Sequence, residues 1–237
     1  MNLAIIGYGK MGKTIEKIAL DRGHKIVAKI DKLQNNDISI LTEKGAEAAI
    51  EFTEPSSAFE NLKYCIENKI PVVSGTTGWL DKYDALSEIC QQEKGAFFYA
   101  SNFSVGVNLF FKLNKLLAEL MAQHNYTAKI EETHHTQKKD APSGTAITLA
   151  QGILQRNKQY EKWALKDKGD ENSLPIEAFR VNDVPGTHEI TYHSEIDDIS
   201  IKHTAHSREG FALGAVIAAE WLLGKTGVFG MQDMLKL

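Results

Sequence analysis

The chain has 237 residues, of which 43% are hydrophobic and 24% charged, and its formal net charge is −4. This length is sufficient for one large domain or for two smaller ones with cores of their own, and we expect two. The composition is that of a globular protein and excludes a disordered or fibrous chain. A slightly acidic balance, with no run of basic residues longer than a pair, argues against nucleic acid as a main partner.

Cysteine content and the distribution of apolar residues favour a cytoplasmic protein. Cys65 and Cys90 lie outside any C-x-x-C motif and are too few for a disulfide framework, which suits a reducing compartment. The first residues lack the basic segment of a signal peptide. Glu220 interrupts the longest apolar segment, residues 213–223, well short of the roughly 18 residues that a membrane span needs. We therefore expect no membrane partner.

The first 31 residues carry the pattern of a dinucleotide-binding unit. Residues 3–6 form an apolar run typical of a buried parallel strand, a helical pattern follows up to Gly23, and residues 25–30 predict a second strand. Between the first strand and the helix stands Gly7-Tyr8-Gly9-Lys10-Met11-Gly12, and Asp31 follows the second strand. A G-x-G-x-x-G motif is weak evidence alone, but this context is the one that the dinucleotide fingerprint requires.

The fingerprint assigns each of these residues a physical role. Gly7 allows the tight turn, Gly9 lets the backbone approach a pyrophosphate, and Gly12 allows the helix to pack closely on the strand. Asp31 is placed to accept hydrogen bonds from the adenine ribose hydroxyls, which favours NADH. Lys32 is able to neutralise a 2′-phosphate, so the choice between NADH and NADPH stays open.

Further strands and helices alternate along the first half of the chain, which predicts an α/β fold with a Rossmann-type doubly wound parallel sheet. Strands are expected at residues 48–53, 71–74 and 96–100, and helices at residues 55–68 and 81–94. Two of these strands end in small polar loops, Gly75-Thr76-Thr77 and Ser101-Asn102-Phe103-Ser104. Loops at the carboxyl edge of such a sheet hold ligands, although simple β-turns use the same residue types.

The second half reads as an inserted α+β domain with a mixed sheet. Residues 107–123 predict a long amphipathic helix, and strands are expected at residues 128–134, 176–181, 188–194 and 199–203. Residues 156–173 are polar and without period, so we expect a loop there. A last apolar helix, residues 208–223, is expected to return to the first sheet. We assign residues 1–104 and 207–237 to a dinucleotide-binding domain and residues 105–206 to a substrate-binding and tetramerisation domain.

Residues 131–146 bring acid/base groups and an anion site into one strand-to-helix connection. His134 and His135 belong to the residue type that exchanges protons near neutral pH, with an ordinary pKa of roughly 6.5. Lys138 and Lys139 add positive charge. Ser143-Gly144-Thr145 stands where the next helix should begin, so its backbone N–H groups are expected to be free to bind an anion.

Several segments together resemble the dihydrodipicolinate reductase family. They are G-Y-G-K-M-G at 7–12, F-T-E-P at 52–55, G-T-T-G at 75–78, S-N-F-S-V-G-V-N at 101–108, H-H-T-Q-K-K-D-A-P-S-G-T-A at 134–146 and S-R-E-G-F-A-L-G-A at 207–215. The resemblance implies an NADH- or NADPH-dependent reduction of 4-hydroxy-tetrahydrodipicolinate to tetrahydrodipicolinate in lysine and diaminopimelate biosynthesis. It also implies a homotetramer built through the substrate-domain sheets and no metal.

By matching position, the resemblance makes His134 the proton donor or acceptor and Lys138 the assisting acid. His135 and the Ser143-Gly144-Thr145 turn would hold a substrate carboxylate, and loops 75–77 and 101–104 would hold the nicotinamide. The chain departs from the family at Glu51, where Asp is usual.

Three other interpretations remain. A metal site is conceivable because His188, His193, His203 and His206 follow one another late in the sequence, but no H-E-x-x-H or Cys/His spacing is present. A different dehydrogenase acting on an amino acid would share the domains without the 134–146 motif. A non-catalytic dinucleotide sensor would share the fold alone.

Overall fold

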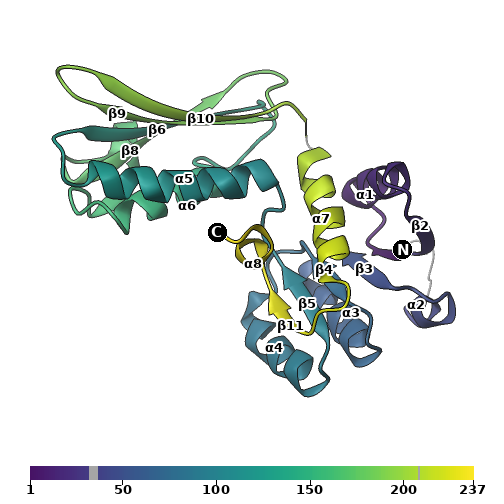
Figure 1. The fold of residues 1–237 in the computed structure, drawn as a ribbon. Coiled ribbons are helices and arrows are strands. Elements are labelled where there is room, and N and C mark those ends of the chain that lie inside the picture. Colours follow the sequence, from purple (N-terminus) through teal and green to yellow (C-terminus); the bar gives the residue numbers. More distant parts are fainter. Residues whose placement is uncertain (32–36, 208) are drawn as a thin grey trace. The chain divides into compact units, whose positions relative to one another are not determined.

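The computed structural model describes residues 1–31, 37–207 and 209–237. It divides into two compact units, Met1–Val105 with Glu209–Leu237, and Gly106–Arg208 (Figure 1). Within the described residues, no helix is both long and apolar enough to cross a membrane.

The first unit is built on a six-stranded parallel sheet of order β11-β5-β4-β3-β1-β2. Its strands are β1 (Asn2–Ile6), β2 (Lys25–Ile30), β3 (Ala48–Glu51), β4 (Val72–Ser74), β5 (Ala96–Tyr99) and β11 (Gly227–Phe229). The central strands are buried on both faces, which is why they are continuous apolar runs in the sequence. The doubly wound parallel sheet predicted from the sequence is confirmed.

Helices cover both faces of this sheet. They are α1 (Lys10–Asp21), α2 (Ile40–Glu43), α3 (Pro55–Glu67), α4 (Tyr83–Gln92), α7 (Glu209–Leu222) and α8 (Met231–Leu235), with a 3-10 turn η2 (Leu80–Lys82). One core joins α1, α7 and α8 to the sheet, and a second core joins α2, α3 and α4 to its other face. α7 packs beside α1 and β3 to β5 (Figure 1), so the last segment of the chain completes the first unit.

The second unit is built on a mixed five-stranded sheet of order β10-β9-β6-β8-β7. Its strands are β6 (Thr127–His134), β7 (Lys162–Leu165), β8 (Ser173–Arg180), β9 (Gly186–His193) and β10 (Asp198–Ala205). β6 runs parallel to β8 and antiparallel to β9. The helices α5 (Val105–Met121) and α6 (Gly144–Leu154) lie on one face of this sheet (Figure 1). The predicted mixed sheet with helices on one face is therefore confirmed.

The segment 156–173, predicted as a loop, instead contains β7, a 3-10 turn η3 (Lys166–Lys168) and the start of β8. The prediction was wrong because β7 is an edge strand and its Lys-Trp-Ala-Leu sequence has no apolar alternation. Pairing with β8 gives this strand its order, and pairing leaves no pattern in the sequence of a single segment.

β6 alternates between the helix-covered core and the other face of its sheet over its whole length. Ala128 and Ile130 point into the core, and Glu132 and His134 continue the same face. The strand ends at His134, whose carbonyl accepts a hydrogen bond from the N–H of Val181 at 2.8 Å. This end of β6 leads directly into the 135–143 connection.

Candidate active site

The glycines between β1 and α1 have the geometry that a bound pyrophosphate requires. Gly7 has φ +95°, and a Cβ placed on it would lie 2.0 Å from the carbonyl oxygen of Phe52. A Cβ on Gly12 would lie 2.2 Å from the carbonyl oxygen of Gly7. Gly9 has no atom within 4 Å of its Cβ position, so its backbone faces open space. These residues fit a dinucleotide at the start of α1.

A cavity of about 440 Å³ opens at this turn. Its walls include Tyr8, Gly9, Asp31, Phe52 and Thr53, contributed by the ends of β1, β2 and β3. Asp31 therefore stands on the cavity wall, whereas Lys32 lies outside the described residues. Lys10 is exposed at the first position of α1. Met11 is half-buried, with its side chain packed against the core.

A buried carboxylate, Glu51, holds the loop that contains Gly75, Thr76 and Thr77. Its oxygens accept hydrogen bonds from Ser74 Oγ at 2.6 Å, from Thr76 Oγ1 at 2.8 Å and from the N–H of Thr53 at 3.0 Å. The Thr76 hydroxyl is therefore used inside the protein, and Thr77 is the exposed residue of the pair. A Cβ on Gly75 would lie 2.2 Å from the Phe52 ring.

The loop Ser101–Ser104 is anchored by its aromatic residue. Phe103 is buried, with its ring centroid 5.8 Å from those of both Phe52 and Phe98. Asn102 Oδ1 accepts a hydrogen bond from the N–H of Ser104 at 2.9 Å. Any contact of Phe103 with a cofactor would thus use its backbone, while Ser101 is exposed and Asn102 and Ser104 are half-buried.

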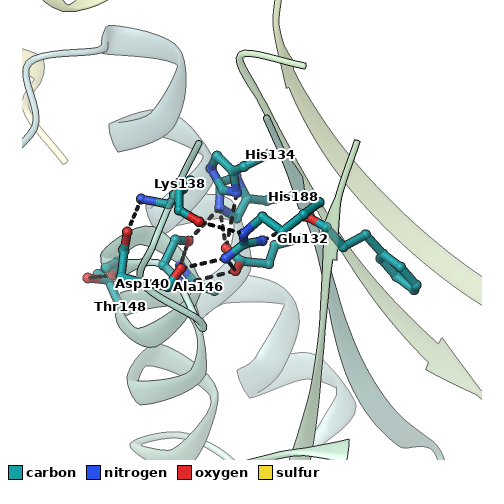
Figure 2. Close-up of polar contacts among 11 residues, drawn as sticks. Glu132, His134, Lys138, Asp140, Ala146, Thr148 and His188 are labelled. Atoms are coloured by element: carbon teal, nitrogen blue, oxygen red, sulfur yellow. Dashed lines mark hydrogen bonds and ion pairs between the residues drawn. The ribbon is translucent and has the colours of Figure 1, made fainter. Parts of the chain in front are cut away.

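In the second unit, three strands place charged side chains around the end of β6. Glu132 stands opposite His188 of β9, and His134 stands opposite Arg180 of β8. Gly186, at the start of β9, leaves room for the imidazole, since a Cβ there would lie 3.1 Å from His134 Nε2. Figure 2 shows Glu132, His134 and His188 converging, with Lys138 and Asp140 beside them.

Glu132 is fully buried and connects these groups. Its Oε1 accepts hydrogen bonds from the N–H of Ser143 at 3.0 Å and from Arg180 Nη2 at 3.2 Å. Its Oε2 lies 3.4 Å from His134 Nδ1 and 3.6 Å from His188 Nε2. Burial alone would raise the pKa of Glu132, but the interactions with His188 and Ser143 outweigh it and lower the pKa to about 2.

His134 has a pKa of about 4, well below its ordinary value. Burial is the largest cause, and the electrostatic effects of His188, Lys138 and Arg180 act in the same direction against the opposing effect of Glu132. The free protein therefore holds a neutral imidazole at pH 7. This corrects the expectation of an acid that titrates near neutrality, because the sequence did not reveal the burial of His134 or the cations around it.

The 135–143 connection separates the two lysines of the motif. Lys138 Nζ lies 2.9 Å from Asp140 Oδ1, and this contact lowers the pKa of Asp140. Lys139 is exposed. Lys138 also acts electrostatically on His134, so it belongs to the same charged cluster.

The predicted anion site at the start of α6 is only partly as expected. The N–H of Ser143 is already donated to Glu132, and its Oγ caps the helix by accepting from the N–H of Ala146 at 3.2 Å. Ser143 is thus a structural cap rather than a free donor. Gly144 is exposed and Thr145 half-buried in the first helical turn, where a helix supplies no carbonyl partner for their N–H groups.

His135 follows the end of β6 and is half-buried. It lines a separate cavity of about 250 Å³ together with Thr136, Asp183 and Pro185. The structure therefore brings His134, Lys138 and Ser143 into one cluster and places His135 at a separate cavity.

Sequence reasoning overlooked Glu132, Arg180 and His188 as members of the site. A signal was present for Glu132, because strict alternation along 128–134 puts its carboxylate on the buried face of the strand, where a charge requires partners. No comparable signal exists for Arg180 and His188, since only the pairing of β8 and β9 with β6 brings them to Glu132.

One group of possible metal ligands is present in the described part of the chain. Its ligand atoms lie within 4.8 Å of one another and belong to Glu132, His134 and His188. Arg180 is bonded to the same carboxylate, which disfavours an added cation. Of the other late histidines, His193 pairs with Asp198 at 2.6 Å and His203 packs on Phe110. The geometry is that of an ion-pair network.

Family models and full-length relatives cover nearly the whole chain. The model described as dihydrodipicolinate reductase, N-terminus, matches residues 1–103, and the model described as dihydrodipicolinate reductase, C-terminus, matches residues 106–235. The chain is 55% identical to 4-hydroxy-tetrahydrodipicolinate reductase of Christiangramia forsetii, over 99% of this chain and 98% of the relative. It is 36% identical to the same enzyme of Clostridium novyi, over 96% and 95%.

Solved structures add evidence on the fold. A dipicolinate-bound dihydrodipicolinate reductase from Paenisporosarcina sp. TG-14 has a TM-score of 0.81 at 21% identity, over 99% of each chain. A probable dehydrogenase from Thermotoga maritima has a TM-score of 0.61 at 10% identity, over 98% of this chain and 92% of that one. With both family models and full-length relatives matching, the chain belongs to the dihydrodipicolinate reductase family of oxidoreductases.

Proposed function

We propose that this protein reduces 4-hydroxy-tetrahydrodipicolinate to tetrahydrodipicolinate with NADH or NADPH, as a step of lysine and diaminopimelate biosynthesis. Full-length identity to a reductase of that name supports the substrate. The structural observation that carries the proposal is the cluster at the end of β6, where His134 and the start of α6 lie against Glu132 and Lys138 acts electrostatically on His134. A substrate with two carboxylates suits a site with this many cationic and N–H donors.

The dinucleotide would bind to the first unit, in the segments 1–104 and 207–237. Its contacts would be Gly7, Tyr8, Gly9, Lys10, Met11, Gly12, Asp31 and Lys32, and the loop residues Gly75, Thr76, Thr77, Ser101, Asn102, Phe103 and Ser104. The cavity beside Gly9 and the tight passages at Gly7 and Gly12 support this assignment. When bound, the reduced nicotinamide supplies the hydride.

The substrate would bind to the second unit, residues 105–206. Lys138, His135 and the Ser143-Gly144-Thr145 turn would hold its carboxylates, with Ser143 acting through its cap of α6. The product has one hydroxyl group fewer than the substrate, so the balanced reaction consumes one proton and releases water. His134 and Lys138 are the groups that would supply this proton, and a positioned acid contributes about 10²–10⁴-fold in rate.

The neutral state of His134 in the free protein fits this role if binding changes its pKa. A dicarboxylate brings negative charge next to the imidazole, which favours the protonated form. Substrate binding would therefore charge the group that then donates the proton.

The test is oxidation of NADH and of NADPH by the purified protein, supplied with the condensation product of pyruvate and aspartate semialdehyde. We expect substrate-dependent loss of the reduced nicotinamide and formation of tetrahydrodipicolinate. Turnover with an amino acid instead would favour the other dehydrogenase. Dinucleotide binding without turnover on either substrate would favour a sensor.

We further infer a cytoplasmic homotetramer that assembles through the sheet of the second unit. Exposed apolar side chains on and beside this sheet, among them Phe179, Val181 and Ile199, support an interface there. Light scattering on the full chain would give the subunit number, and charge substitution at Phe179 is expected to lower it.

A further inference from the structure

The two ring nitrogens of His134 lie in different surroundings. Nδ1 is buried, has no hydrogen-bond partner in the described part of the chain, and lies 3.4 Å from Glu132 Oε2. Nε2 lies beside Gly186 at the start of β9, where a Cβ would lie 3.1 Å away. The ring therefore presents Nδ1 to Glu132 and Nε2 to the side of Gly186, which carries no side chain.

The two oxygens of the Glu132 carboxylate differ in their hydrogen bonds. Oε1 is bound by Ser143 at the start of α6 and by Arg180 of β8. Oε2 is buried, and its near polar neighbours are the imidazoles of His134 and His188. The carboxylate is therefore held by its own strand, by a helix start and by a second strand.

Among the groups that act electrostatically on His134, Glu132 favours its protonation and three others oppose it. Arg180 approaches from β8, His188 from β9 and Lys138 from the 135–143 connection. Asp140, on the same connection, is held by Lys138 at 2.9 Å. Glu132 is thus the one group among these that favours a charged imidazole.

We propose that Glu132 is a positioning residue for proton transfer, which accepts a hydrogen bond from Nδ1–H of His134 and thereby directs Nε2 to the substrate. The inference rests on the proposed role of His134. When the dicarboxylate binds, Nε2 takes up a proton from solvent, and Glu132 stabilises the imidazolium. Nε2 then gives this proton to the substrate, while the Nδ1 proton stays in place and Glu132 remains ionised.

The wild-type protein gives the first test, by NMR of the imidazole ¹⁵N nuclei of His134 in the full-length chain. Near pH 7 we expect the Nδ1–H tautomer in the free protein. Saturation with pyridine-2,6-dicarboxylate is expected to give a doubly protonated ring. An Nε2–H tautomer in the free protein would overturn the proposal without any variant being made.

The second test is the pH profile of turnover in Glu132→Gln and Glu132→Asp. Loss of the charge in Glu132→Gln should move the alkaline limb of kcat to lower pH by about 1–3 units, the usual effect of an opposite charge at this distance. Glu132→Asp, which keeps the charge, should recover most of this shift. A merely structural role would lower kcat at every pH and leave the limb in place, which would refute the proposal.

Glu119→Gln is the matched control, since it removes the same charge from an exposed position on α5. It is expected to leave kcat and the limb unchanged. If circular dichroism shows that Glu132→Gln does not fold, the Asp variant and the wild-type spectra decide. Failure of the wild type to reduce the substrate would count against the proposed function, whereas an unshifted His134 titration in Glu132→Gln would count against Glu132 alone.

Discussion

Each unit of this protein contains a carboxylate that is fully buried, and the two are used differently. Glu51 in the first unit accepts hydrogen bonds from hydroxyl and amide donors on both of its oxygens, including the Thr53 hydroxyl. Glu132 in the second unit has hydrogen bonds on Oε1, whereas Oε2 has no hydrogen-bond partner among the described residues and lies 3.4 Å from His134 Nδ1 and 3.6 Å from His188 Nε2. A carboxylate with hydrogen bonds on both oxygens holds loops in place. A carboxylate with one oxygen outside such bonds can act on a neighbouring group that titrates.

The largest effect is expected at the group that Glu132 faces. His134→Gln should lower turnover by about 10² or more, because a general acid is lost, and should leave dinucleotide affinity nearly unchanged. Steady-state kinetics and fluorescence titration with NADH measure the two quantities. An equal loss of NADH binding would contradict the assignment.

Lys138 and Lys139 provide an internal comparison within one connection. Lys138→Ala should reduce both turnover and substrate affinity, by about tenfold each, because a charged hydrogen bond is typically worth about 1.5–3 kcal/mol. Lys139→Ala should do little, since Lys139 is exposed. The reverse outcome in kcat and KM would move the functional lysine by one position.

Glu51→Gln tests the role of the carboxylate that accepts hydrogen bonds on both oxygens. Replacing one oxygen by an amide leaves a hydroxyl donor without its acceptor, which should lower the free energy of unfolding by about 1–3 kcal/mol. Dinucleotide affinity should fall as the loops around Thr53 and Thr76 loosen, while the pH profile of kcat keeps its position. Denaturant unfolding and NADH titration measure both, and a shifted profile would mean that the two carboxylates do not differ as described.

Acid should destabilise the protein through the second unit. Between pH 6.5 and about 4 the unfolded chain protonates His134 while the folded protein does not, so the free energy of unfolding falls as pH is lowered, by at most about 3 kcal/mol. Glu132, whose pKa falls from 4.5 to about 2, adds a further loss below pH 4.5. Denaturant unfolding over this pH range measures how steeply the free energy of unfolding falls. His134→Gln should remove the part of this fall that lies between pH 6.5 and about 4. A slope that persists in the variant would assign it to other groups.

The smallest effect is expected at the nucleotide cavity. Asp31→Ala should weaken NADH binding by about 0.5–1.5 kcal/mol, the net contribution of a hydrogen bond. NADPH binding should weaken less, because the carboxylate of the wild type repels a 2′-phosphate. Comparing the two dissociation constants gives the result. Equal losses would show that Asp31 does not contact the ribose.

Local patterns were sufficient for much of the fold. The apolar run before Gly7, the helical spacing after it and the alternation of 128–134 each predict the element that the structure contains. They failed at β7, where an edge strand has no alternation. They also failed for the N–H of Ser143, whose partner lies 11 residues earlier in the chain.

The sequence alone determined the doubly wound sheet, the glycine turn at its nucleotide edge and the mixed second sheet. These depend on residue type and short-range spacing, which each segment carries by itself. The roles of His134 and Lys138 were predicted from the family resemblance and stay predictions. Only the tertiary structure decided that Glu132, Arg180 and His188 surround His134, and that its imidazole is neutral at pH 7. The reason is that burial and electrostatic neighbours depend on the pairing of β6 with β8 and β9, which no single segment of the chain specifies.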